Sequence, residues 1–165
     1  MDEFKFFKNF KERGEWVEAR FMADAMRHGY KVLKPWGDSQ PYDVALAFGN
    51  RIVRVQVKST TCRIGTGYFC QFRPNYRSQP YQLHQLEFFA ACVIPRDTWY
   101  LIPARLLLCG VQNKVGLMLH PMQPLKKDRY RYESYREAWP SSPRAPTEPY
   151  PPASACRAGA PARCL

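Results

Sequence analysis

The chain has 165 residues, 45% of them hydrophobic, and a formal net charge of +11, which suits one globular domain with a polyanionic partner. No apolar stretch reaches the roughly 18 residues of a membrane-spanning helix, and acids and lysines interrupt the N-terminus throughout, so a secretory signal is excluded as well. Its six cysteines form no C-x-x-C pair, which excludes a zinc knuckle, and the apolar content makes a disulfide scaffold unnecessary. We therefore expect a cytoplasmic protein that binds nucleic acid; a protein that is merely basic is the alternative.

Residues 5–30 are predicted to form one long helix or a broken pair, because apolar residues recur there at three- and four-residue spacing. Gly29 is a plausible end, and residues 34–41 form a turn-rich loop. Two strand-like runs follow at 42–48 and 51–58. The two residues between them, Gly49 and Asn50, predict a tight β-hairpin.

The stretch 59–82 is polar, aromatic and basic, with a short strand predicted at 68–72. Further strands are predicted at 86–94, 99–102 and 115–120, with a short helix at 104–108 and a charged, tyrosine-rich helix at 126–139. Seven of the 15 prolines fall within 140–165, so this tail is predicted to be disordered. The predicted domain is therefore 1–139.

The predicted hairpin brings polar side chains together at one end. A two-residue loop places Asp43 opposite Gln56, and alternation along the strand puts Lys58 on the same face. The opposite face is aliphatic and is predicted to face the core. Its members are Val44, Leu46, Val53, Val55 and Val57.

A carboxylate, an amide and an ammonium in one place have a chemical use. Mg²⁺ binds hard oxygen ligands, which Asp43, Gln56 and the backbone carbonyl of Val57 can supply. Lys58 can hold an attacking water and offset charge that develops on a phosphate. The alternative is an ordinary solvated face of an antiparallel hairpin.

The run 34–43, followed by 54–60, resembles the PD-(D/E)XK nuclease motif, and more narrowly the group I intron-associated homing endonucleases. The family's Pro-Tyr-Asp matches Pro41-Tyr42-Asp43, and its Val-Gln-Val-Lys-Ser matches residues 55–59. A Gly-x-x-x-Glu helix precedes the loop in that family, as Gly14 to Glu18 does here. Residues 87–103 look like the family's second strand pair, so the likeness covers about residues 11–103.

The resemblance implies an α/β restriction-endonuclease-like core, with a central mixed β-sheet flanked by helices. It implies cleavage of double-stranded DNA with Mg²⁺, or Mn²⁺ as the alternative metal, by a homo-oligomer that is a dimer or a tetramer. By position, Asp43 is the principal metal ligand, Lys58 is the catalytic lysine, and Gln56 occupies the place of the second acid. Glu18 matches the helix glutamate that faces the site; an acid at the rim of a semi-apolar helix face is the alternative.

Arg63, Arg73 and Arg77 lie among aromatic residues, a composition that suits DNA contact, although an ordinary loop accounts for it equally well. Gln56 brings no charge, which keeps open a catalytically inactive DNA-binding protein derived from such a nuclease. A restriction, repair or junction-resolving nuclease of the same fold is a further alternative. A peripheral membrane protein is disfavoured, since no basic helix has a clean apolar face.

Overall fold

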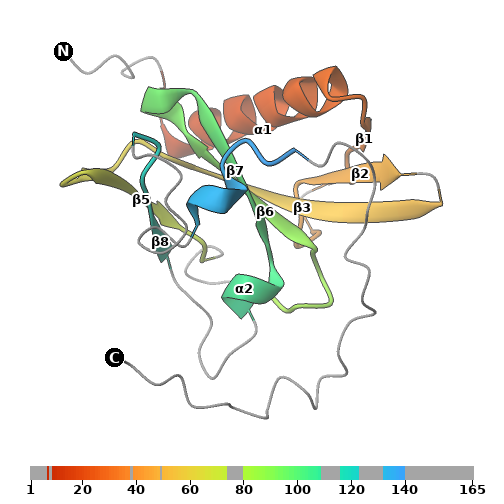
Figure 1. Ribbon diagram of the computed structural model, residues 1–165. Helices are drawn as coiled ribbons and strands as arrows, with labels where there is room; N and C mark the ends of the chain where they lie inside the picture. Colours follow the sequence, from red (N-terminus) through yellow and green to blue (C-terminus); the bar gives the residue numbers. More distant parts are fainter. Residues whose placement is uncertain are drawn as a thin grey trace, which may run out of the picture.

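The computed structural model describes residues 7, 9–37, 39–48, 50–73, 80–108, 116–122 and 132–139. One long helix, α1 (Phe10–Arg27), lies along one side of the main sheet (Figure 1). It begins where the Asn9 side chain accepts a hydrogen bond from the backbone N–H of Glu12 at 2.9 Å, and it buries Val17 and Phe21 against the sheet. Gly29, at φ 84°, follows its end. The predicted helix is confirmed as a single, shorter element.

The central sheet has five strands in the order β1-β2-β3-β6-β7. Their bounds are β1 Lys31–Leu33, β2 Val44–Phe48, β3 Arg51–Thr60, β6 Phe88–Val93 and β7 Thr98–Pro103. All neighbours pair antiparallel except β3 and β6, which are parallel, so the predicted mixed sheet is confirmed. The three-residue β1 was not predicted, and β3 runs two residues beyond its predicted end.

The parallel pair β3–β6 is fixed at its start by an ion pair between the two strands. The Arg54 guanidinium lies 2.6 Å from one Glu87 carboxylate oxygen, and the Arg54 backbone N–H donates to the other oxygen at 2.6 Å. The backbone N–H of Glu87 returns a hydrogen bond to the Arg54 carbonyl at 2.9 Å. Charge-assisted bonds of this kind set the register that places Gln56 beside Phe89.

A second, smaller sheet has the order β4-β5-β8, with bounds Arg63–Ile64, Gly67–Gln71 and Gly116–Leu119. The end of β3 meets it, where the Thr60 hydroxyl donates to the Phe69 carbonyl at 2.6 Å. The short helix α2 (Arg105–Leu108) follows β7. The strands predicted at 68–72 and 115–120 and the short helix are confirmed; β4 was not predicted.

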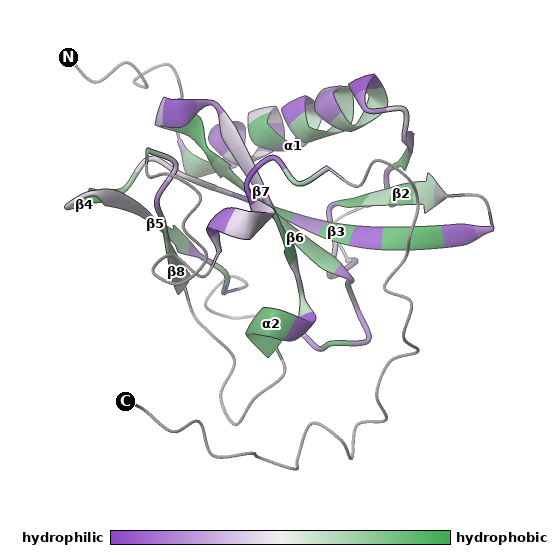
Figure 2. Cartoon of the chain, in the orientation of Figure 1, coloured by the Kyte–Doolittle hydropathy of each residue, from purple (hydrophilic) through white to green (hydrophobic). Residues whose placement is uncertain are grey.

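Buried side chains form two clusters, one on each face of the central sheet. Alternation along β6 and β7 divides them between the two faces. On β3, hydrophobic residues alternate with polar ones, which Figure 2 shows as green and purple bands. The cluster under α1 includes Phe21, Val55, Val57 and Ala90. The cluster on the other face includes Cys70, Tyr81, Phe89 and Leu119. Both buried cysteines of the described residues, Cys70 and Cys92, are free thiols.

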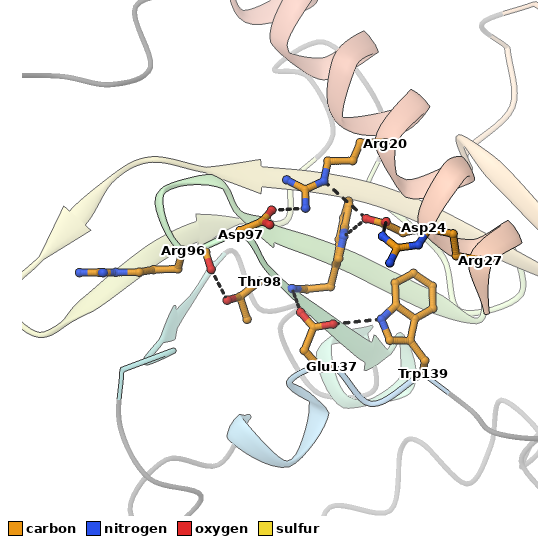
Figure 3. A network of polar contacts seen from close by, with 9 residues as sticks. Arg20, Asp24, Arg27, Arg96, Asp97, Thr98, Glu137 and Trp139 are labelled. Atoms are coloured by element: carbon orange, nitrogen blue, oxygen red, sulfur yellow. Dashed lines mark hydrogen bonds and ion pairs between the residues drawn. The ribbon is translucent and has the colours of Figure 1, made fainter.

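A network of polar contacts fastens α1 to the turn between β6 and β7 (Figure 3). The Arg20 guanidinium pairs with both Asp24 and Asp97, and the Trp99 indole N–H donates to the Asp24 carboxylate at 2.9 Å. Asp97 follows the 3-10 turn η1 (Ile94–Arg96) in the left-handed conformation, at φ 51°. The helix therefore sits at a fixed position over the sheet.

The helix predicted at 126–139 is wrong over 132–139. There the chain forms a short 3-10 turn, η2 (Glu133–Tyr135), and then a single β-bridge between Arg136 and Tyr100. Glu133 is buried and accepts hydrogen bonds from the Tyr100 hydroxyl at 2.8 Å and from the His120 backbone N–H at 2.7 Å. These long-range partners hold the segment against β7 and β8 in place of a helix.

Residues 123–131 and the predicted tail 140–165 lie outside the described residues. Within the described ranges, no helix combines the length and the hydropathy of a membrane span.

Candidate active site

The β2–β3 hairpin has the register that the sequence predicts. Val44 pairs with Val55 and Leu46 with Val53, which directs these side chains into the cluster under α1. The regular ladder stops at Val44, and the backbone N–H of Asp43 donates to the Val55 carbonyl at 3.0 Å. Asp43 therefore stands at the point where β2 and β3 part.

The Asp43 carboxylate is fixed by two donors from β3. The Gln56 side-chain amide donates to Oδ2 at 2.5 Å, and the Val57 backbone N–H donates to the same oxygen at 2.8 Å. Oδ1 accepts no hydrogen bond from any described residue. Because Gln56 uses its amide nitrogen toward Asp43, its carbonyl oxygen is the end left to contact a further group.

Lys58 completes the group on the same face of β3. Its ammonium lies 5.5 Å from the centre of the Tyr81 ring. Burial lowers the pKa of Lys58, and the negative charge of Asp43 opposes that shift. The predicted meeting of a carboxylate, an amide and an ammonium is therefore present in the structure.

Burial also changes the pKa of the Asp43 carboxyl group. The pKa of Asp43 is raised from 3.8 to about 6, chiefly by desolvation and further by the charge of Glu18. The Val57 N–H, the Lys58 ammonium and the Gln56 amide act in the opposite direction. A carboxylate whose charge is disfavoured by its surroundings gains most when a cation binds to it.

Glu18 lies at the periphery of this group. It belongs to α1, on the other face of the sheet, and its carboxylate pairs with the Lys34 ammonium at 3.0 Å. Since β2 pairs with β3 only as far as Val44, the Glu18 charge still acts on both Asp43 and Lys58. The structure thus places Glu18 within electrostatic range of the site but shows no hydrogen bond to it among the described residues.

The oxygen atoms available around Asp43 suit a hard divalent cation. They are Asp43 Oδ1, the Gln56 amide oxygen and the Val57 carbonyl, which lies on the same side of the strand as the Val57 N–H. One carboxylate with neutral oxygens, completed by waters and a substrate phosphate, is a normal environment for Mg²⁺. Among the described residues, no group of three His, Cys, Asp or Glu side chains is placed so that it could hold a metal ion.

Of the three arginines predicted to contact DNA, the structure describes two. Arg63 lies exposed on β4, with its Nε donating to the Gly65 carbonyl at 3.3 Å, and Arg73 lies exposed just after β5. Arg77 lies outside the described residues. The structure therefore leaves their contact with DNA untested.

Sequence reasoning missed Tyr81 and Lys34 as neighbours of the site. Tyr81 follows a segment without strand or helix periodicity, so only the fold reveals that it reaches Lys58. Lys34 opens the loop that carries the motif, but it is 16 residues from Glu18 in the sequence, so no local signal indicates their ion pair.

Comparison with known proteins adds independent support. A family model described as PD-(D/E)XK endonuclease matches residues 8–140. Among solved structures, the chain resembles a bacterial homing endonuclease, I-Ssp6803I, with a TM-score of 0.63 and 24% identity. That match covers 81% of this chain and 90% of the other, and at this identity it supports the shared fold alone. No curated protein sequence shows a significant match.

Proposed function

The chain belongs to the PD-(D/E)XK endonuclease family, and from this premise we propose that it is a metal-dependent endonuclease that hydrolyses phosphodiester bonds of double-stranded DNA. The observation that carries the proposal is the convergence of Asp43, Gln56 and Lys58 on one face of the β2–β3 hairpin. A merely solvated hairpin face would not hold a half-buried acid and a half-buried lysine beside a buried amide.

Mg²⁺, with Mn²⁺ as the alternative, is the proposed cofactor. Asp43, Gln56 and the Val57 carbonyl would hold it, with Glu18 as an outer carboxylate that adds negative charge. When bound, such an ion polarises the phosphate and makes a water molecule easier to deprotonate.

The residues of the chain then have distinct tasks. Asp43, ionised above its raised pKa, supplies the negative charge that attracts a cation. Gln56 and the Val57 N–H keep that carboxylate at one orientation. Lys58 places a positive charge where the phosphodiester gains negative charge, as the bond from the attacking water oxygen to phosphorus forms and a bond from phosphorus to a sugar oxygen breaks.

The net charge of +11 supports a DNA substrate, and exposed Arg63 and Arg73, together with Arg77, are the proposed contacts. The proposal extends to a sequence-specific, homing-type enzyme associated with a group I intron, as the resemblance of residues 34–60 to that group of endonucleases implies. A chain of this size spans a long target only by association, so a homo-oligomer, dimer or tetramer, is part of the proposal, as is a cytoplasmic location.

Incubation with a library of randomised duplexes and Mg²⁺, followed by sequencing of the cut ends, tests this function. Cutting at a defined sequence that a chelator abolishes is the expected result. Salt-sensitive binding without cutting in Mg²⁺ or Mn²⁺ would instead select a catalytically inactive DNA-binding protein. The neutral Gln56, in the place of the second acid, is the observation that favours this second candidate. Cutting at unrelated sequences or at branched DNA would point to a repair or junction-resolving nuclease.

A further inference from the structure

We propose that Tyr81 is a positioning residue whose aromatic face holds the Lys58 ammonium in place beside Asp43, an inference that rests on the proposed nuclease function for its consequence in catalysis. No part of the recognisable motif contains Tyr81, which reaches the site from the crossover between β3 and β6.

The geometry is that of a cation over an aromatic ring. The Lys58 Nζ atom lies 5.5 Å from the Tyr81 ring centre, inside the roughly 6 Å over which the ring's negative face attracts a cation. Tyr81 is 8% exposed, so the contact is largely shielded from water. Within the described residues, Tyr81 is the aromatic side chain over which this ammonium lies.

The ring is itself held in place by the neighbouring strand. Tyr81 packs edge-on against Phe89, with centroids 5.5 Å apart and planes at 70°. Phe89 is fully buried on β6 and pairs in register with Gln56. The ring is thus packed against the strand that adjoins the amide of the site.

A lysine needs such a support here. Its four-carbon stem is flexible, and fixing it costs free energy that a preformed contact reduces. Burial and the negative charge of Asp43 raise the pKa of Tyr81, so its hydroxyl stays protonated and the ring stays neutral near physiological pH. A neutral Tyr81 ring keeps the negative face that attracts the ammonium.

The first test is the position of Lys58 in the intact protein, which does not depend on cutting. The Lys58 Cε methylene signals, assigned by their loss in Lys58→Arg, are expected upfield of ordinary lysine signals in the native protein and in Tyr81→Phe. They return to ordinary values in Tyr81→Leu and stay upfield in the control Tyr68→Leu. Tyr68 is a buried tyrosine of the same cluster. An unchanged upfield shift in Tyr81→Leu would overturn the proposal.

The second test measures catalysis with near-isosteric replacements. Phenylalanine carrying one, two or three fluorines at position 81 weakens the ring's negative face while keeping its shape. We expect kcat to fall stepwise with each fluorine, by about tenfold in all, with KM and melting temperature unchanged. A kcat that stays the same across the fluorinated variants would contradict the proposal. A native protein that cuts no duplex with either metal refutes the proposed function, and the methylene signals still decide the role of Tyr81.

Discussion

The backbone N–H of Val57 donates to the Asp43 carboxylate at 2.8 Å, and this bond ties the acid to the strand that carries the amide and the lysine. On the N-terminal side of Val44, the chain no longer forms the regular β2–β3 ladder. The Asp43 carboxylate therefore accepts the hydrogen bond that the Val57 N–H would otherwise donate to a backbone carbonyl of the neighbouring strand. At this end of β3, the Asp43 side chain therefore takes the place of a backbone partner.

Lys58→Ala is expected to abolish cutting while leaving DNA affinity within about tenfold, because the lysine acts mainly on charge that develops in the transition state. Single-turnover cleavage and equilibrium binding in Ca²⁺ measure the two effects separately. Arg63→Ala is the matched control: it removes a positive charge from an exposed position and should weaken binding and its salt dependence while cleavage persists. Intact cutting by Lys58→Ala would remove this residue from the mechanism.

Gln56→Glu is expected to change the metal requirement. The new carboxylate would lie against Asp43 in a buried position, so the metal-free variant should lose about 1–3 kcal/mol of stability at neutral pH. Added Mg²⁺ should restore part of that loss and bind more tightly than to the native protein. Denaturant unfolding with and without metal measures both, and Gln71→Glu, at an exposed position, is the control. Identical metal titrations for native and Gln56→Glu protein would exclude Gln56 as a ligand.

Asp43 should make the metal-free protein less stable as pH rises from about 4 to about 7. Its pKa is raised from 3.8 to about 6, so the folded protein keeps a proton that the unfolded chain has lost. The stability tied to that proton is complete below pH about 4 and is lost as pH rises through about 6. Asp43→Asn removes the titration and should exceed the native protein in stability by about 2 kcal/mol at pH about 7. Denaturant unfolding in a chelator across this range gives the difference, which must shrink toward acid pH.

Two truncations separate the predicted tail from the segment that precedes it. Removing 140–165 should leave the melting temperature and the cutting unchanged. Removing 132–165 also deletes Glu133 and Trp139, leaving the buried Tyr100 hydroxyl without its carboxylate acceptor, at a cost of about 1–3 kcal/mol for that group alone. Thermal unfolding of the two proteins tests the distinction. A large loss on removal of 140–165 would show that the tail belongs to the fold.

The active-site hairpin could be predicted because its determinants are local. Gly49 and Asn50 set the loop length, and the aliphatic alternation then fixes which face Asp43, Gln56 and Lys58 share. The resemblance to the family supplied the mixed sheet. That β3 and β6 form its parallel pair was not predicted, because no local pattern in 59–87 indicates it.

The errors fall where distant partners decide the outcome. Residues 132–139 are charged and aromatic enough to suggest a helix, yet Glu133 is buried because Tyr100 and His120 supply its donors. Tyr81 lies beside Lys58 only because the chain returns between two parallel strands. The short β1 is held by its pairing with β2, and its three residues are too few for a pattern.

The connection between β3 and β6 can change in length without changing the hairpin that carries Asp43 and Lys58. The spacing between Asp43 and Lys58 depends on the hairpin alone, so residues inserted into or lost from the crossover leave that spacing intact. The same segment carries β4, with Arg63, on the exposed surface of the molecule. Related proteins with this fold can therefore differ in the surface residues of this connection while the proposed catalytic residues keep their positions. The condition is that an aromatic ring still packs against the lysine.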